Sequence, residues 1–161
     1  MVKQAEQKDI PVIEEILLDA VNWLQSIGMD NKWTNRSVLW ENLSKEYNIT
    51  DFYIAYEGQQ PAACMALTDM DVTYWPQIPK GTSLYLHKLA VKRQFAGNGY
   101  SKVLIDFAKQ KGIERKIKTL RLDCNKNNTK LRAIYEKQGF QFIENESIAR
   151  EKGMALYVNQ L

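Results

Sequence analysis

The spacing of hydrophobic residues alternates along the chain between a helical period and a strand period. After a short candidate edge strand at residues 2–5, apolar residues recur at helical spacing from Ile13 to Leu24. Asp9 is a candidate N-cap and Pro11 lies in the expected first turn. These positions predict a helix that begins after Asp9 and ends near Gly28.

Residues 35–82 show three further patterns. A weaker helical pattern runs from about Asn35 to Tyr47. The stretch DFYIAYEGQQPAACMAL then holds two strand-like runs joined around Glu57-Gly58-Gln59, which is typical of a β-hairpin. The segment TDMDVTYWPQIPKGT carries two prolines and a glycine, so we expect a loop there.

The next part of the chain alternates strands and helices. The run LYLHKLAV, residues 84–91, is apolar almost without interruption, as expected of a strand buried on both faces. A helical pattern marked by Val103, Leu104 and nearby apolar residues is expected to end near Gly112. The run TLRLDC, residues 119–124, predicts another strand.

The C-terminal part predicts one helix and two closing strands. Asn128 is the candidate N-cap of the helix, and Gly139 is its expected end. The runs QFIENESI (residues 141–148) and GMALYVNQL (residues 153–161) suggest two strands in a hairpin. The whole order is β-α-α-β-β-β-α-β-α-β-β, which indicates a single α/β domain over residues 1–161.

Composition limits the classes of partner. The formal charge of +3, from 22 basic and 19 acidic residues, suits a polyanionic small ligand but is too small to argue for nucleic acid. The two cysteines, Cys64 and Cys124, lie too far apart for a disulfide framework or a metal cluster, so we expect no metal. The N-terminus lacks a signal-peptide core and no run approaches about 18 apolar residues, so we expect a cytoplasmic protein without a membrane partner.

The segment RQFAGNGYSK, residues 93–102, follows the apolar strand after one lysine. Its two glycines lie between a strand and a helix, where they serve either a tight turn or a loop whose backbone N–H groups bind an anion. Lys92, Arg93 and Lys102 would add positive charge. The spacing is not a Walker loop, and it is not the full G-x-G-x-x-G fingerprint, because Lys102 replaces the third glycine.

Two motifs together resemble the GNAT N-acetyltransferase superfamily. The first, LAV-x-x-Q-x-x-G-x-G, runs from Leu89 to Gly99. The second, NTKLRAIYEKQGF at residues 128–140, is similar to the family pattern N-x-x-A-x-x-L-Y-x-K-x-G-F, with Leu131 where the family often has alanine. The close similarity covers about residues 84–142, and the N-terminal half agrees in element order only.

The resemblance implies a fold, a ligand and a reaction. The fold is a central mixed, mostly antiparallel β-sheet flanked by about four helices. The ligand is acetyl-CoA, a co-substrate whose pantetheine arm pairs with strand backbone and whose pyrophosphate binds the glycine loop. The reaction is direct transfer of the acetyl group to an amine. The coenzyme-binding residues that the resemblance implies are Leu89, Ala90, Val91, Gln94, Phe95, Ala96, Gly97, Asn98, Gly99, Tyr100, Ser101, Asn128 and Tyr135.

Two residues are candidates for proton transfer. Tyr135 matches the family's general acid, which protonates the departing thiolate; the alternative is a half-buried tyrosine that packs its helix on the core. His87 is the only histidine, and an ordinary imidazole pKa of about 6.5 suits it to accept the proton of the amine. In some relatives a histidine at this place on the strand is implicated in that step. The alternative for His87 is a core residue hydrogen-bonded to backbone.

The sequence leaves the acceptor open among small polyamines, aminoglycosides, amino acids and protein N-termini. Asp69 and Asp71 would either attract a cationic acceptor or lie in a solvated loop. The tryptophans either line the acceptor pocket or belong to the core: Trp23, Trp33, Trp40 and Trp75. A non-catalytic domain that binds or senses coenzyme A is the alternative to an enzyme. Either a monomer or a homodimer is compatible with the sequence.

Overall fold

The structure, a computed structural model, describes residues 1–29, 32–144 and 147–161. The chain divides into two compact units. Unit 1 comprises Met1–Leu67 and Lys88–Leu104, and unit 2 comprises Thr68–His87 and Ile105–Leu161. Within the described ranges, no helix is both long enough and apolar enough to cross a membrane.

Unit 1 contains the N-terminal helices and the predicted hairpin. Its elements are β1 (Val2–Gln4), α1 (Ile10–Ser26), α2 (Trp40–Leu43), β2 (Phe52–Glu57) and most of β3 (Gln60–Thr68), with short 3₁₀ turns at Gln7–Asp9, Ile49–Asp51 and Arg93–Phe95. Strands β2 and β3 pair antiparallel, and β1 pairs with β2 as the edge strand. Gly58 takes the left-handed conformation (φ 57°) in the hairpin turn. The predicted hairpin and edge strand are therefore confirmed.

Helix α1 forms the core of unit 1 with strand β2. Its buried side chains are Ile13, Ile16, Leu17 and Val21. They pack in one cluster with Phe52 and Ile54 of β2. The helix begins and ends close to the predicted limits, but the Asp9 carboxylate does not cap it. That carboxylate accepts a hydrogen bond from the Glu6 N–H at 2.8 Å and closes the preceding turn.

The second predicted helix, from Asn35 to Tyr47, is wrong for most of its length. Only Trp40–Leu43 is helical, and turns flank it. Side chains here bond to nearby backbone instead: the Ser37 hydroxyl accepts from the Thr34 N–H, and the Asn42 amide donates to the Arg36 carbonyl. Such local bonds compete with helical hydrogen bonds, and hydrophobic periodicity does not reveal them.

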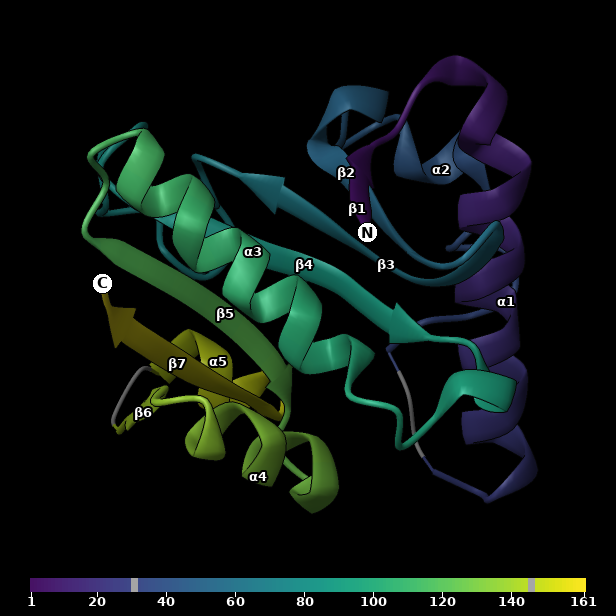
Figure 1. Cartoon of the computed structure of the whole chain (residues 1–161). Helices are drawn as coiled ribbons and strands as arrows, with labels where there is room; N and C mark the ends of the chain where they lie inside the picture. The colour runs from purple at the N-terminus through teal and green to yellow at the C-terminus, as the bar shows by residue number, and fades with distance from the viewer. Residues whose placement is uncertain (30–31, 145–146) are drawn as a thin grey trace. The chain divides into compact units, whose positions relative to one another are not determined.

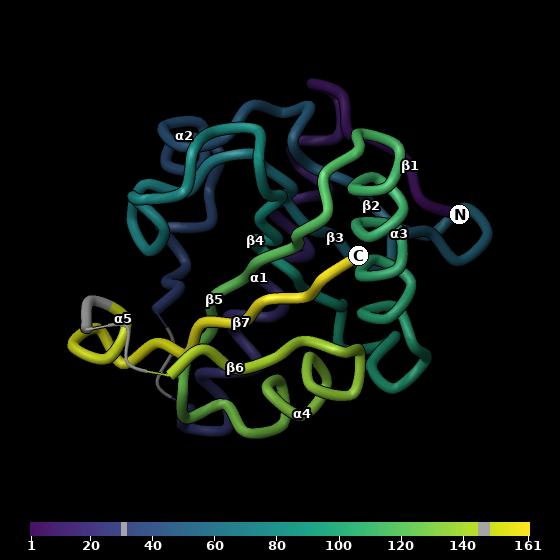
Figure 2. The backbone as a smooth tube through the Cα atoms, turned by 90° about the vertical axis from the view of Figure 1, so that its left-hand side faces the viewer, coloured from purple at the N-terminus to yellow at the C-terminus, as the bar shows by residue number. Residues whose placement is uncertain are grey.

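Unit 2 contains the C-terminal strands and helices. The elements of this part of the chain are β4 (Leu84–Val91), α3 (Tyr100–Glu114), β5 (Thr119–Asn125), α4 (Thr129–Lys137), β6 (Gln141–Ile143), α5 (Ser147–Glu151) and β7 (Met154–Gln160). Strand β5 pairs parallel with β4 and antiparallel with β7, and β7 pairs antiparallel with β6. Strands β5, β7 and β6 lie side by side in Figure 1, and Figure 2 traces the chain from β5 to β7.

Strand β4 and helix α3 each contribute residues to both units. Through β4 the strand order is β1-β2-β3-β4-β5-β7-β6, a mixed and mostly antiparallel sheet of seven strands. The predicted fold class is confirmed. The described chain contains five α-helices rather than about four, because α5 lies between the two closing strands.

The two faces of the unit 2 strands carry different groups. On one face, Tyr85 of β4 and Leu156 of β7 pack with Trp75 of the 69–83 loop and Ala149 of α5. The other face carries Tyr157 of β7, whose ring lies 6.2 Å from the ring of Tyr135 on α4. Because paired residues in a sheet share a face and neighbours alternate, the registers of β5 and β7 place these groups on opposite sides.

One prediction near the C-terminus needs correction. Residues 141–148 are not one strand: β6 ends at Ile143, residues 145–146 lie outside the described chain, and Ser147–Glu151 is helical. Helix α3 ends at Glu114, close to the predicted end near Gly112, but Gly112 itself lies inside the helix. A Cβ atom at Gly112 would meet the Leu161 side chain, so close packing and not helix termination accounts for this glycine. The C-terminal hairpin pairing of β6 with β7 is confirmed.

Candidate functional site

The glycine loop of unit 1 joins the end of β4 to the start of α3. Gly97 and Gly99 both take the left-handed conformation, with φ of 84° and 83°. A Cβ atom at either position would meet no heavy atom of the described chain within 4 Å. Both glycines are therefore explained by backbone conformation and by the open space above the loop, and not by a close neighbour in the protein.

The start of α3 presents backbone N–H groups beside this loop. The first hydrogen bond of the helix runs from the Val103 N–H to the Gly99 carbonyl at 3.1 Å. The N–H groups of Tyr100 and Ser101 precede this bond, so they have no partner inside the helix. Loop and helix start together form a backbone surface suited to a phosphate or pyrophosphate.

The basic side chains beside the loop are largely engaged within unit 1. The Lys92 ammonium lies 2.7 Å from a Glu15 carboxylate oxygen. The Arg93 guanidinium stacks over the Trp23 ring at 4.3 Å, and the Arg93 N–H donates to Asp19 at 2.6 Å. Neither Lys92 nor Arg93 is thus a simple free cation, and the expected contribution of their charge to anion binding is smaller than the sequence suggests.

The strand leading into the loop has an irregular backbone at Lys88. This residue has a φ of 52°, unusual for a non-glycine residue and more so inside a strand. Its carbonyl accepts a weak hydrogen bond from the Cys64 thiol at 3.9 Å, and its ammonium lies over the rings of Trp33 and Tyr47 at 5.2 and 5.9 Å. The predicted pantetheine-pairing residues, Leu89 to Val91, follow this irregularity directly.

His87 lies in unit 2, on the face of β4 that also carries Tyr85. The two rings are nearly parallel, with centroids 6.4 Å apart. The His87 Nδ1 atom lies 4.0 Å from Oδ1 of Asp123 on β5, and the two side chains are only 15% and 16% exposed. An imidazole beside a carboxylate can accept a proton and be stabilised as imidazolium. The role of His87 as base or as core residue stays a prediction.

Tyr135 lies in unit 2 on the opposite face of the strands from His87. Its side chain is buried and packs against Phe140 and Tyr157, with ring centroids 5.7 and 6.2 Å away. Burial raises the pKa of Tyr135 well above its usual value, and the nearby Cys124 and Asp123 raise it further. Tyr135 thus packs the core, as its alternative interpretation requires, and it also keeps its hydroxyl proton at neutral pH.

The parallel pairing between the strands that carry these groups is short. Strands β4 and β5 pair at Leu84 with Leu120 and at Tyr85 with Arg121. His87 and Asp123 follow on the same face as this second pair, and the His87 Nδ1 atom lies 4.0 Å from Oδ1 of Asp123.

Asn128 and Cys124 have structural explanations. The Asn128 side chain accepts a hydrogen bond from the Leu131 N–H at 3.1 Å, which confirms the predicted N-cap of α4. Its coenzyme contact stays a prediction. Burial raises the pKa of the Cys124 thiol to about 12, so this cysteine is not an activated nucleophile. Both cysteines are free and buried, as expected of a chain without disulfides.

The tryptophans divide between core packing and cation contacts. Trp33 and Trp40 pack against the core of unit 1, and Trp75 belongs to the core of unit 2. Trp23 holds the Arg93 guanidinium. For Trp75, core packing does not account for every atom: its Nε1 has no hydrogen-bond partner within the described chain although the side chain is buried.

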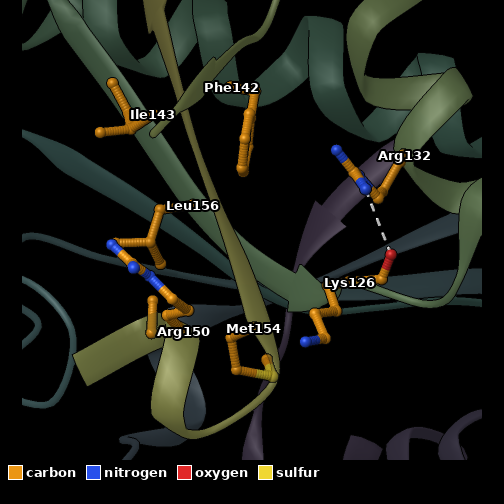
Figure 3. Close-up of a pocket in the computed structure, with 8 residues that line it drawn as sticks. Lys126, Arg132, Phe142, Ile143, Arg150, Met154 and Leu156 are labelled. Carbon is orange, nitrogen blue, oxygen red and sulfur yellow. Dashed lines mark hydrogen bonds between the residues drawn. The ribbon is translucent and has the colours of Figure 1, made fainter. Parts of the chain in front are cut away.

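A cavity lies in unit 2 beside β6, α5 and β7. Its volume is about 210 Å³, and Figure 3 shows its lining: Lys126, Arg132, Phe142, Ile143, Ala149, Arg150, Met154 and Leu156. Arg132 is held in place by the Tyr157 hydroxyl at 2.8 Å and the Lys126 carbonyl at 3.2 Å. None of the predicted site residues lines this cavity.

Comparison with known proteins identifies the family. The profile of the Acetyltransferase (GNAT) family matches residues 15–140. The chain belongs to this family. It is also 28% identical over 153 residues to an uncharacterized N-acetyltransferase, YesJ, of Bacillus subtilis (strain 168), which covers 86% of this chain and 80% of that protein. The chain is therefore an acetyltransferase, and the predicted family and enzyme class are confirmed.

Solved structures agree with this assignment. A GNAT acetyltransferase of Listeria monocytogenes 4b F2365 has a TM-score of 0.74 and 26% identity, covering all of this chain and 94% of that one. The PaiA N-acetyltransferase of Thermoplasma acidophilum, solved in complex with coenzyme A, has a TM-score of 0.78 and 15% identity, covering all of this chain and 98% of that one. The second likeness supports the GNAT fold.

The structure groups the predicted site residues in two places. Residues 89–91 and 94–101 lie in unit 1, and His87, Asn128 and Tyr135 lie in unit 2. Sequence reasoning missed Asp123 as a neighbour of His87. The alternating pattern of TLRLDC showed that Asp123 shares a face with Arg121, but the register of β5 against β4 was needed to bring it to the histidine.

Proposed function

We propose that this acetyltransferase uses acetyl-CoA as its co-substrate and transfers the acetyl group directly to a primary amine. The observation that carries the proposal is that His87 lies beside Asp123 on one face of the unit 2 strands, while Tyr135 packs against Tyr157 on the other face. Direct transfer needs a proton acceptor on the side of the attacking amine and a donor on the side of the departing sulfur.

The backbone of residues 94–101 is the proposed pyrophosphate site. Two left-handed glycines and the N–H groups of Tyr100 and Ser101, which have no partner inside α3, provide donors without requiring many charged side chains. The pantetheine arm would pair with the strand backbone at Leu89 and Val91. The PaiA structure contains coenzyme A on a similar fold, which supports this choice of ligand.

His87 is the proposed general base. It accepts one proton from the amine, directly or through a water molecule, as the amine nitrogen forms its bond to the thioester carbon. The Asp123 carboxylate at 4.0 Å stabilises the resulting imidazolium. An alkylamine has an ordinary pKa near 10.4 and is mostly protonated at neutral pH, so a base is needed before it can attack.

Tyr135 is the proposed donor to the leaving group. When the carbon–sulfur bond breaks, the sulfur takes the electron pair, and the Tyr135 hydroxyl donates to it. A thiol has an ordinary pKa of about 8.5, so its thiolate is a weaker base than a tyrosinate. Because burial raises the pKa of Tyr135 still further, the hydroxyl contributes mainly a hydrogen bond to the developing thiolate.

A pH series on His87→Gln tests the proposal. Thiol release from acetyl-CoA is followed with an alkylamine acceptor and with an aromatic amine whose pKa is low. The wild-type kcat/KM for the alkylamine should rise through an apparent pKa near that of imidazole. In His87→Gln this limb should disappear or move, and kcat/KM should fall about a hundredfold or more.

Two controls accompany this series. A melting curve must show that His87→Gln is folded, because a purely structural histidine would lower stability and leave the pH limb in place. The aromatic amine needs no deprotonation, so its rate should change much less in the variant. Binding of coenzyme A by the wild type without amine-dependent thiol release from any amine would instead support the non-catalytic alternative, which the family assignment does not favour.

A further inference from the structure

One face of helix α1 contacts the residues at which the glycine loop begins. Glu15, Asp19 and Trp23 follow one another at intervals of four residues, which places them in one row along the helix. Each of them contacts Lys92 or Arg93, the two residues that follow β4 directly. All five residues belong to unit 1. The three helix residues are called the α1 contact row below.

The α1 contact row engages both side chains and backbone. The Lys92 ammonium lies 2.7 Å from Oε1 of Glu15. Oδ2 of Asp19 accepts the Arg93 N–H at 2.6 Å, and the Arg93 guanidinium lies over the Trp23 ring at 4.3 Å. Arg93 is the first residue of a 3₁₀ turn, so the Asp19 carboxylate satisfies an N–H group that the turn itself leaves without a partner.

The backbone extends these contacts toward the loop glycines. The Lys92 N–H donates to the Ala62 carbonyl of β3 at 2.8 Å, and the Lys92 carbonyl accepts the Phe95 N–H at 2.9 Å. The Phe95 ring lies 5.9 Å from the ring of Tyr100, at the start of α3. A series of contacts thus runs from α1 and β3 through the 3₁₀ turn to the start of α3.

Charge alone does not account for the two acids of this row. Carboxylates beside a loop that binds an anion weaken that binding, and Glu15 also pairs with a cation that would strengthen it. A pair with one exposed partner adds little to the stability of the fold. An ordered loop explains these acids better, because every other conformation that the free loop takes lowers its apparent affinity for a ligand.

We propose that the α1 contact row positions residues 94–101 in the conformation that binds the pyrophosphate of coenzyme A. This inference rests on the proposed function and adds positioning residues to it. The row supplies no ligand atom; it raises the fraction of the free protein whose loop is ready to bind. Lys92 and Arg93 then have a different role from the one their charge suggests, because their cationic groups attach the loop to α1.

Calorimetry with coenzyme A tests the role of Asp19. Asp19→Ala removes the acceptor of the Arg93 N–H, whereas Asp19→Asn keeps an oxygen there and removes only the charge. Asp19→Ala should bind coenzyme A about fivefold more weakly or worse, as expected from the loss of a capping contact, and Asp19→Asn should stay within about twofold of wild type. If the carboxylate acted only as a nearby negative charge, both variants would instead bind coenzyme A more tightly.

A second variant tests the aromatic member of the row. Trp23→Leu removes the ring under the Arg93 guanidinium and so releases a cation beside the loop. A site that depends on free positive charge would bind coenzyme A more tightly in this variant. The inference predicts weaker binding instead, and Trp23→Leu provides this comparison even if a melting curve shows that Asp19→Ala is unfolded.

Three controls separate positioning of the loop from a general structural role. Pantetheine lacks the pyrophosphate, so its affinity should be the same in wild type, Asp19→Ala and Trp23→Leu. In steady-state kinetics KM for acetyl-CoA should rise in Asp19→Ala while kcat holds. Glu14→Ala is the matched control: Oε1 of Glu14 accepts the Trp40 N–H at 2.6 Å, so this variant loses one charge and one carboxylate–backbone bond from the same helix, but at α2. It should keep its affinity for coenzyme A.

The results that would overturn the inference differ from failure of the proposed function. Wild-type or higher affinity for coenzyme A in folded Asp19→Ala and Trp23→Leu would overturn it, and so would an equal loss in Glu14→Ala or an equal loss for pantetheine. If Gly97→Ala still weakens coenzyme A binding in any of these cases, the loop remains the proposed pyrophosphate site and only the role of the row fails. A wild type that binds no coenzyme A would overturn the proposed function and this inference with it.

Discussion

At the scale of single residues, burial and neighbouring charge decide which groups can act on protons. Cys64 and Tyr135 are both buried, and burial raises the pKa of each well above its ordinary value. For the thiol this removes the reactive thiolate. For the tyrosine it preserves the form that donates a hydrogen bond. Burial therefore makes the Cys64 thiol unreactive and keeps the Tyr135 hydroxyl able to donate a hydrogen bond.

Tyr135→Phe should separate donation from packing. The ring stays between Phe140 and Tyr157 and only the hydroxyl is lost, so affinity for acetyl-CoA should hold while kcat falls about a hundredfold or more. Because the pKa of Tyr135 is raised, its proton is retained above pH 10, and the wild-type kcat should show no alkaline decline from this group below about pH 10. Steady-state kinetics across pH check both points.

The control for this variant is Tyr53→Phe, which removes the hydroxyl of another buried tyrosine, on β2. It should leave kcat near the wild-type value. Equal kcat in Tyr135→Phe and Tyr53→Phe would mean that the Tyr135 hydroxyl takes no part in catalysis and that the residue only packs the core.

At the scale of elements, the prediction from sequence succeeded where local signals act alone. Helix α4 begins after Asn128 and ends before Gly139, and Gly58 lies in the hairpin turn, as predicted. Caps and left-handed turns depend on residues close in sequence, so the sequence alone reveals them. The helix at 35–47 failed because side chains such as Asn42 bond to nearby backbone. The contact of His87 with Asp123 could not be predicted, since these residues lie more than thirty positions apart in the chain and meet only through the register of their two strands.

The glycine loop offers a prediction at this scale. Alanine at position 97 or 99 meets no protein atom, so its cost to the fold is the strain of the left-handed conformation, roughly 1–2 kcal/mol. If the loop binds a pyrophosphate, the added methyl group also keeps the anion from the backbone. Gly97→Ala and Gly99→Ala should therefore lower coenzyme A affinity at least about tenfold in calorimetry.

Gly58→Ala is the matched control for strain. Gly58 also has a left-handed conformation and open space around its Cβ position, but it lies in the β2–β3 turn. It should lose similar stability and keep its affinity for coenzyme A. An equal loss of affinity in all three variants would mean that strain, and not the approach of an anion, explains the effect.

At the scale of the whole molecule, the net charge is too small for basic side chains alone to bind a polyanion. In this acetyltransferase fold we expect oriented backbone N–H groups to bind it instead. The formal charge is only +3, and two of the basic residues near the glycine loop, Lys92 and Arg93, are engaged by Glu15 and Trp23. Affinity for coenzyme A should for this reason depend less on salt than a site built from free lysines would.

Coenzyme A should accordingly stabilise the whole fold. A ligand that binds only the folded chain, at a hundred times its Kd, adds about 2.7 kcal/mol to the free energy of unfolding. For a chain of this size each kcal/mol raises Tm by roughly 2–4 °C, so we expect a rise of about 5–10 °C in a thermal melt.

Pantetheine at the same concentration lacks the pyrophosphate and should give a much smaller shift, because the backbone donors of residues 94–101 have nothing to bind. Gly97→Ala, compared with its own ligand-free melt, should lose most of the coenzyme A shift. Equal shifts from pantetheine and coenzyme A would mean that contacts with the pantetheine arm, and not with the loop at residues 94–101, provide most of the binding free energy.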